Sequence, residues 1–255
     1  MDFLVSASTD KGIKKNTNQD SLAIKVADTS VGKIALALIC DGMGGLQQGE
    51  VASATLTRAF SEWFDNNLSQ LIQEGLDDLK IRREWERIIK NVNKKILIYG
   101  QQQRIRLGTT IVAALFTEDR YYIVNVGDSR IYEIKNHVNL LTQDQTVVEN
   151  EYRKGLITRE QADNDPRKSV LLQCVGATGD VYPEMYFGKT ETDTVYMLCS
   201  DGFRHVISTE ELYEHLKPEV LTSKEVMKQQ SELLIELNKT RMEQDNITVS
   251  LIRTF

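Results

Sequence analysis

The sequence has few of the residues that mark linkers and disulfide frameworks. Its 255 residues include only three prolines and three cysteines. No long Gly/Ser-rich or Pro-rich stretch separates two folding units. We therefore predict one domain over residues 1–255. The odd number of cysteines, without paired spacing, favours a reduced, cytoplasmic setting over a disulfide-stabilised secreted fold.

Long apolar and basic runs are also missing. The longest apolar run, Ile34 to Cys40, is far too short to span a bilayer. The first ten residues lack the basic and then apolar pattern of a signal peptide. The formal net charge is -6, and the basic residues are scattered, so the electrostatic footprint of a nucleic-acid binder is absent. We expect neither a membrane nor nucleic acid among the partners.

Short apolar runs of strand length alternate with grouped helical patterns. The predicted strands are Phe3–Ser8, Leu22–Val26, Lys33–Cys40, Thr109–Phe116, Tyr121–Val126, Ile131–Ile134, Glu184–Lys189, Thr194–Cys199 and Ile247–Ile252. The predicted long helices are Glu50–Asn66, Arg83–Gln101 and Ser223–Lys239, with another helix beginning near Thr209. The stretch Gln70–Lys80 is polar and weakly defined.

Hairpin-linked strands and paired helices favour an α+β fold with largely antiparallel sheets and helices on their outer faces. Several strands are apolar on both sides, which two stacked sheets would explain. The segment 144–168 is polar and is predicted to leave the core with two short helices, Val147–Lys154 and Thr158–Asp163.

Five aspartates lie at the ends of predicted strands. Asp41 and Asp201 each follow an apolar strand and precede a glycine, and Asp128 follows a glycine turn. Asp20 and Asp245 lie at strand edges. Carboxylates brought together resist ionisation unless a cation compensates them, and hard oxygen ligands suit Mg²⁺ or Mn²⁺. One Asp-Gly pair is usually only a turn, but five aspartates in this setting favour a metal site.

Short motifs that include these aspartates run through almost the whole chain. They are Thr9-Asp10-x-Gly12, Asn18-Gln19-Asp20, Asp41-Gly-Met-Gly-Gly45, Gly49-Glu50, Gly108-Thr109-Thr110, Val126-Gly-Asp-Ser-Arg130, Leu141-Thr-Gln-Asp144, Gly155-Leu-Ile-Thr158, Ser200-Asp-Gly202 and Asp245-Asn-Ile-Thr248. In content and order they resemble the motifs of the PP2C-type, metal-dependent protein phosphatases in their bacterial form. A set of motifs in the right order is far more specific than any one of them.

This resemblance implies a central β-sandwich flanked by helix pairs in four layers, with a flap at about 144–168. It implies hydrolysis of phosphoserine and phosphothreonine in proteins, opposing a bacterial Ser/Thr kinase. A hydroxide that bridges two Mn²⁺ or Mg²⁺ ions is the expected nucleophile. A third, weaker ion site is expected at Asp128, shared with Asp201.

The resemblance also implies a ligand set for the two ions. Asp41 is expected to bridge them. Asp201 and Asp245 complete one ion site, and the carbonyl oxygen of Gly42 contributes to the other. Asp20 is expected to support the second ion through water. Catalysis is therefore assigned to Asp41, Asp201 and Asp245, acting through metal-bound water.

Three positions depart from the family pattern. Lys15 stands where the family usually has an arginine that grips the substrate phosphate. Lysine is a point charge and cannot form the bidentate fork of arginine, yet we expect Lys15 to contact the phosphate. Met43 replaces the histidine of many eukaryotic members, as is common in bacteria. Gln145 replaces the family histidine after Asp144.

Three other functions are compatible with parts of the sequence. The first is a catalytically weak phosphatase fold that binds or senses phosphoproteins, for which Lys15 is the only supporting feature. The second is a metal-dependent nuclease or another phosphoester hydrolase, which the scattered basic residues disfavour. The third is a cysteine-based phosphatase, which needs an arginine six residues after its cysteine. Those positions hold Leu46, Asp180 and His205. We expect Cys40 and Cys199 to be core residues and His205 to lie outside the site.

Overall fold

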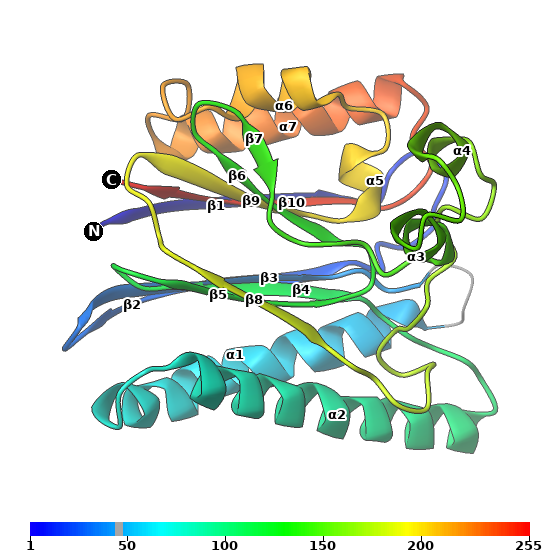
Figure 1. The fold of residues 1–255 in the computed structure, drawn as a ribbon, viewed down its shortest axis with the longest axis horizontal. Coiled ribbons are helices and arrows are strands. Elements are labelled where there is room, and N and C mark those ends of the chain that lie inside the picture. The colour runs from blue at the N-terminus through cyan, green and yellow to red at the C-terminus, as the bar shows by residue number, and fades with distance from the viewer. Residues whose placement is uncertain (44–47) are drawn as a thin grey trace.

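The computed structural model describes residues 1–43 and 48–255, so Gly44, Gly45 and Leu46 of the sequence analysis lie outside the described residues. Two five-stranded sheets stack face to face, and every pairing between named strands is antiparallel (Figure 1). The first sheet has the order β1 (Phe3–Asp10), β10 (Ile247–Thr254), β9 (Thr194–Cys199), β6 (Arg130–Ile134), β7 (Val138–Leu140). The second has the order β2 (Ser21–Thr29), β3 (Gly32–Cys40), β4 (Ile111–Phe116), β5 (Tyr121–Val126), β8 (Glu184–Gly188).

Helices cover the outer face of each sheet. The helices α1 (Gly49–Gln73) and α2 (Asp78–Gln103) lie on the second sheet, and α6 (Thr209–Leu216) and α7 (Lys224–Thr240) lie on the first (Figure 1). A separate apolar cluster fills the space between the sheets, with Ile39, Val112 and Tyr196 among its members. Burial on both faces explains the continuous apolar runs of the central strands. The predicted four-layer α+β sandwich is confirmed.

The two long helices extend beyond their predicted limits. The polar stretch Gln70–Lys80 continues α1 as far as Gln73 and begins α2 at Asp78, leaving a short turn between them. The Asp77 side chain accepts a hydrogen bond from the backbone N–H of Lys80, which caps α2. Such a cap satisfies an N-terminal N–H group that has no partner within the helix. The short strand β7 was not predicted.

The helix α6 begins at Thr209, as predicted. Its N-cap is Ser208, whose hydroxyl accepts a hydrogen bond from the N–H of Glu211. The Glu211 carboxylate accepts the Ser208 N–H in return, which completes a capping box.

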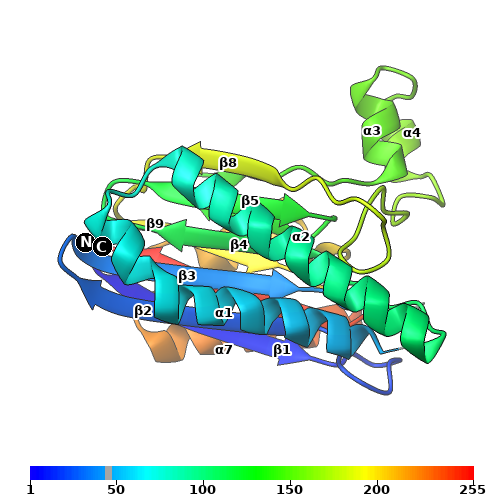
Figure 2. The same ribbon diagram turned by 90° about the horizontal axis from the view of Figure 1, so that it is seen from below.

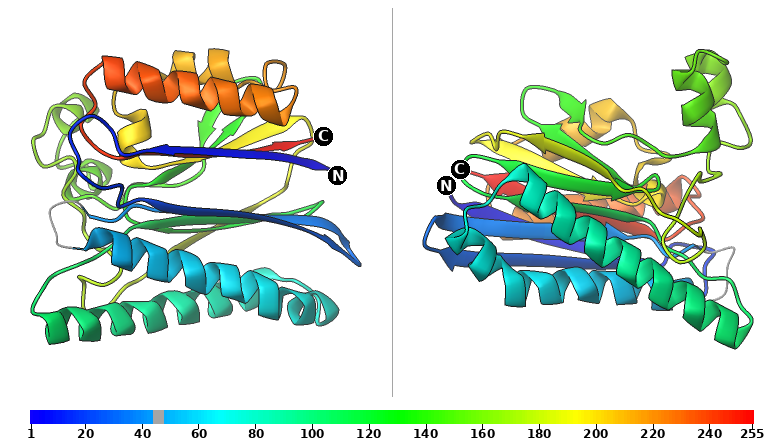
Figure 3. Two further views of the ribbon diagram at one scale, coloured as in Figure 1. Left: turned by 180° about the vertical axis from the view of Figure 1, so that it is seen from behind. Right: turned by 60° about the horizontal axis from the view of Figure 1, so that its bottom comes forward.

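Residues 144–168, here called the flap segment, protrude from one end of the sandwich (Figure 2). They carry α3 (Val147–Arg153) and α4 (Arg159–Asp163), as predicted. The two chain termini lie side by side at the opposite end (Figure 3), where the N–H of Asp2 donates to the carbonyl of Phe255 at 2.9 Å. No helix in the described part of the chain is long and apolar enough to cross a membrane.

Candidate active site

Strand register brings the predicted aspartates to one end of the sandwich. In the second sheet Ser21 of β2 pairs with Cys40 of β3, so Asp20 and Asp41 are neighbours at the edge of that sheet. Antiparallel pairing makes the start of one strand adjacent to the end of the next. These two residues are 21 positions apart in the sequence only because a hairpin separates them.

Antiparallel pairing also brings two aspartates together in the first sheet. Val249 of β10 pairs with Cys199 of β9, which places Asp201 and Asp245 at the corresponding edge. Asp201 is the first residue of α5 (Asp201–Arg204), a short helix that was not predicted. Since the sheets stack, the two pairs of aspartates meet across the sandwich.

The electrostatics of Asp41 show how closely the aspartates gather. Burial raises its pKa well above the ordinary value, and the negative charges of Asp20, Asp201, Asp128 and Asp245 raise it further. Each of the predicted carboxylates therefore lies near enough to oppose ionisation of Asp41. The structure brings all five together.

Two of the neighbours share this behaviour. Burial raises the pKa of Asp20 to about 7, with a further contribution from the charge of Asp201. Burial also raises the pKa of Asp128 to about 7, and again the charge of Asp201 adds to the effect. Without a cation, burial and mutual repulsion raise the proton affinity of these carboxylates.

Two carboxylate oxygens of the cluster have no hydrogen-bond partner among the residues that the structure describes. They are the Oδ1 atoms of Asp20 and Asp201, both of which are buried. The other oxygen of Asp20 accepts a 2.6 Å hydrogen bond from the Thr248 hydroxyl. Buried polar atoms are normally satisfied, so orphaned acidic oxygens beside other carboxylates fit a site for a hard cation.

Lys15 lies inside the site. Its Nζ is 2.8 Å from Oδ1 of Asp245. Burial lowers the pKa of Lys15, but the hydrogen bond to Asp245 and the charges of Asp41 and Asp201 outweigh that effect and raise it overall. The residue expected to hold the substrate phosphate thus contacts an expected metal ligand.

Two glycines allow the loops of the site to approach each other. A Cβ on Gly42 would lie 2.4 Å from the carbonyl oxygen of Gln19 and 2.6 Å from Gly49. A Cβ on Gly202 would lie 2.2 Å from the carbonyl oxygen of Asn246. Both contacts are with backbone atoms, which cannot rotate away. The glycines that follow Asp41 and Asp201 are therefore required for close packing of the loops. This requirement adds to the turns that the sequence suggested at both positions.

Two contributors were missed by the sequence analysis. His205, which was expected to lie outside the site, places Nε2 3.4 Å from Oδ2 of Asp201. Its Nδ1 lies 3.3 Å from Oε2 of Glu243. The spacing of four residues puts Asp201 and His205 on the same side of α5 and its C-cap, which was the one available signal. Nothing in the sequence pattern pointed to Glu243.

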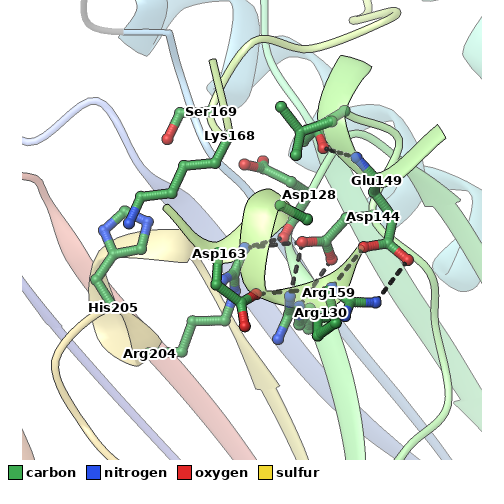
Figure 4. A pocket seen from close by; sticks show the side chains of 13 residues that line it. Asp128, Arg130, Asp144, Glu149, Arg159, Asp163, Lys168, Ser169, Arg204 and His205 are labelled. Atoms are coloured by element: carbon green, nitrogen blue, oxygen red, sulfur yellow. Dashed lines mark hydrogen bonds and ion pairs between the residues drawn. The ribbon is translucent and has the colours of Figure 1, made fainter. Parts of the chain in front are cut away.

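A polar cavity of about 290 Å³ lies between this cluster and the flap segment. Asp128, His205 and Arg204 contribute to one side, and flap residues including Lys168 contribute to the other (Figure 4). Asp144, at the base of the flap segment, accepts two hydrogen bonds from Arg130, at 2.7 and 2.8 Å. Arg130 therefore braces the flap base.

The Asp128 loop is held by other residues. Arg204 donates from Nη2 to the carbonyl oxygen of Asp128 at 3.1 Å and to Asp144 at 3.2 Å. Gln145, in the position of the family histidine, accepts the N–H of Gly127 at 2.9 Å. Cys40 and Cys199 are fully buried on their strands, as expected of core residues.

Within residues 1–43 and 48–255, no three His, Cys, Asp or Glu side chains form a group that could hold a metal ion as they stand. The carboxylates are instead engaged by protein groups, such as Lys15 and His205. The oxygen donors, the charge concentration and the orphaned oxygens suit a cation, but a ready-made cage is not present.

Comparison with known proteins decides the family. The family model described as protein phosphatase 2C matches residues 11–239. The chain belongs to the protein phosphatase 2C family. It is a metal-dependent serine/threonine protein phosphatase, as the order of its motifs predicted.

Relatives and solved structures agree with this assignment. A serine/threonine phosphatase, stp, from Listeria monocytogenes serotype 4b is 32% identical over 248 residues, covering 96% of this chain and 93% of its own. The crystal structure of Stp1 from Staphylococcus aureus is 26% identical, with a TM-score of 0.83 over 100% of this chain and 96% of its own. The catalytic domain of the phosphatase PstP, solved with 2 manganese ions, is 27% identical, with a TM-score of 0.77 over 98% and 97%.

Proposed function

We propose that this phosphatase removes phosphate from phosphoserine and phosphothreonine in proteins with the help of two Mn²⁺ or Mg²⁺ ions held by the aspartate cluster. The observation that carries the proposal is the convergence of five aspartates from separate segments, four of which oppose ionisation of the fifth, Asp41. A divalent cation removes that penalty, because it favours the charged form of every carboxylate around it.

In this proposal Asp41 bridges the two ions, with Asp201 and Asp245 on one of them and the Gly42 carbonyl on the other. Asp20 supports the second ion through water, and Asp128 contributes to a third, weaker site. The solved PstP structure with 2 manganese ions supports the choice of metal and the number of ions. Such ions, when bound, supply Lewis-acid activation of water and neutralise charge on the phosphoryl group.

Binding of the ions requires the carboxylates to change partners. Oδ1 of Asp245 could serve an ion only if it gave up the ammonium group of Lys15, which now lies 2.8 Å away. The released Lys15 remains next to the site, on the loop between β1 and β2, and can pair with a phosphate oxygen. We therefore assign the substrate phosphate to Lys15, with a point charge in place of the family's arginine fork.

The cavity between the flap segment and the aspartate cluster is lined by charged side chains from both. A folded or extended phosphoprotein segment would approach along this cavity. We propose that the physiological role is to oppose a Ser/Thr kinase. Co-expression with a Ser/Thr kinase of the same bacterium should therefore lower the phosphothreonine content of that kinase's substrates.

The direct test is hydrolysis of a phosphothreonine peptide with Mn²⁺, with Mg²⁺ and with a chelator. We expect turnover with either ion and none with the chelator. Asp41→Ala should abolish turnover, while the matched change Asp28→Ala, at an exposed position on β2, should leave it unaltered. Full activity of the Asp41→Ala variant, or equal activity with the chelator, would refute the two-ion site.

A further inference from the structure

We infer that His205 and Glu243 form a supporting pair that orients Asp201 and couples it to the loop of Asp245, and that this pair sets the affinity of the site for its ions. The inference rests on the proposed metal site. His205 and Glu243 are positioning residues here, because neither is expected to touch an ion or the substrate.

The geometry connects three side chains and a backbone segment in a row. His205 places Nε2 3.4 Å from Oδ2 of Asp201 and Nδ1 3.3 Å from Oε2 of Glu243. The Glu243 side chain is only 9% exposed. Its second oxygen, Oε1, accepts the backbone N–H groups of Gln244 at 2.7 Å and of Asp245 at 2.9 Å. One carboxylate thus holds the imidazole ring and the backbone of Asp245 at the same time.

The arrangement divides the two oxygens of Asp201. Its Oδ2 faces the imidazole, while its Oδ1 is buried without a hydrogen-bond partner. A carboxylate that is held through one oxygen presents the other in a fixed direction. Partners of this kind commonly change metal affinity by about 10–100-fold when they are removed.

The pair adds little net charge to the site. Both ring nitrogens of His205 face carboxylate oxygens, so a proton on either nitrogen has an acceptor, and any positive charge on the ring lies next to Glu243. Its effect on the ions therefore comes mainly from orientation. The test must separate an effect of orientation from an effect of charge, because a neutral side chain at position 205 can alter both.

The fold around the pair has its own supports. The Asn238 side chain donates to the carbonyl of Phe203 at 3.0 Å, and the Asn238 carbonyl accepts the N–H of Glu243 at 3.0 Å. Arg241 donates to the carbonyl of Val206 at 2.7 Å. The loops that carry Asp201 and Asp245 are thus joined without the imidazole. Loss of the ring should change ion binding while the fold persists.

The test compares three neutral replacements of His205 by calorimetric titration with Mn²⁺ in the absence of substrate. His205→Gln places an amide donor near the position of Nε2 and so keeps the contact with Asp201. His205→Asn keeps a donor only toward Glu243, and His205→Ala keeps neither. All three replace the titratable ring by a neutral side chain. We expect the dissociation constants of the Ala and Asn variants to exceed that of the Gln variant by about tenfold or more.

Equal dissociation constants for the Gln, Asn and Ala variants would overturn the inference, because a purely electrostatic role does not distinguish them. His137→Ala, at an exposed histidine on the β6–β7 turn, is the matched control and should bind Mn²⁺ like the original protein. Glu243→Gln offers a second route if His205→Ala fails to fold. It replaces the carboxylate that holds both the imidazole ring and the backbone of Asp245, so it should also weaken Mn²⁺ binding by tenfold or more, and unaltered binding would count against the pair.

The titration separates this inference from the proposed function. If the original protein binds no Mn²⁺, the metal site itself is wrong, and the inference falls with it. If the original protein binds Mn²⁺ and the three His205 variants bind equally, only the inference is wrong. The urea midpoint of each ion-free variant should stay close to that of the original protein, since a general loss of structure would lower it.

Discussion

The concentration of carboxylates should make the ion-free enzyme less stable as the pH rises, and Asp20 allows this to be measured. Its pKa rises from 3.8 to about 7 in the folded chain, mainly through burial. An acid with a higher pKa in the folded state holds its proton more tightly when folded. The folded state therefore loses stability between about pH 4 and pH 7, where the unfolded chain is ionised but the folded chain is not.

The magnitude follows from the size of the pKa change. At about 1.4 kcal/mol per pH unit, a rise of about 3 pH units corresponds to about 4 kcal/mol once both states are ionised. Asp20→Asn removes the ionisation and keeps an oxygen for the 2.6 Å hydrogen bond from Thr248. The new amide also places a donor where Oδ1 now has no partner. We expect the variant to be more stable than the original protein without ions, by an amount that grows with pH.

The assay is urea unfolding in the presence of a chelator at pH 5 and at pH 8. The advantage of Asp20→Asn should increase by about 3 kcal/mol between these two values, which is the part of the titration that lies between pH 5 and pH 7. Asp28→Asn, at an exposed position, should show no such increase. If Asp20→Asn is more stable than the original protein by the same free energy at both pH values, or less stable at both, the electrostatic account is refuted. Excess Mn²⁺ should stabilise the original protein and shrink the difference.

Three further changes test other parts of the site. Lys15→Arg should lower KM for a phosphothreonine peptide by restoring a bidentate grip, and an unchanged KM would show that Lys15 does not hold the phosphate. Gly202→Ala should destabilise the protein by about 1–3 kcal/mol in urea unfolding, because its Cβ would meet the backbone oxygen of Asn246 at 2.2 Å. Asp144→Asn should cost about 3–5 kcal/mol and increase proteolysis in the flap segment, since it leaves Arg130 and Arg204 without their shared carboxylate. An exposed flap carboxylate, changed in Asp163→Asn, should affect neither measurement.

The β-sandwich and the aspartate cluster could be predicted from the sequence because both depend on where strands begin and end. An apolar run marks where a strand lies, and an aspartate directly after it must emerge at an edge of the sheet. Asp41 and Asp201 follow this rule, as does Asp128 after its glycine turn. The periodic pattern could not show that the edges coincide. Only the ordered motifs indicated that the strand ends carrying the aspartates lie together. The pairings Ser21–Cys40 and Val249–Cys199 now give the physical reason within each sheet.

Elements without a strong local pattern were missed. The short α5 has only four residues, and the three-residue β7 is stabilised by its pairing with β6. Helix extent was also underestimated where polar residues continue a helix on its exposed side, as in α1 beyond Asn66. In such segments tertiary packing decides the structure, and intrinsic propensity is a weak guide.

The support behind the aspartates could not be predicted for a different reason. A residue that binds an ion must present an oxygen, nitrogen or sulfur donor, which limits the choices. A residue that orients such a ligand needs only to reach it through space, from any element. His205 meets Asp201 through one turn of helix, whereas Glu243 meets His205 from the segment before β10, 38 positions along the chain. Sequence motifs therefore identify the charged residues of this site. The residues that hold them in position are identified only in the structure.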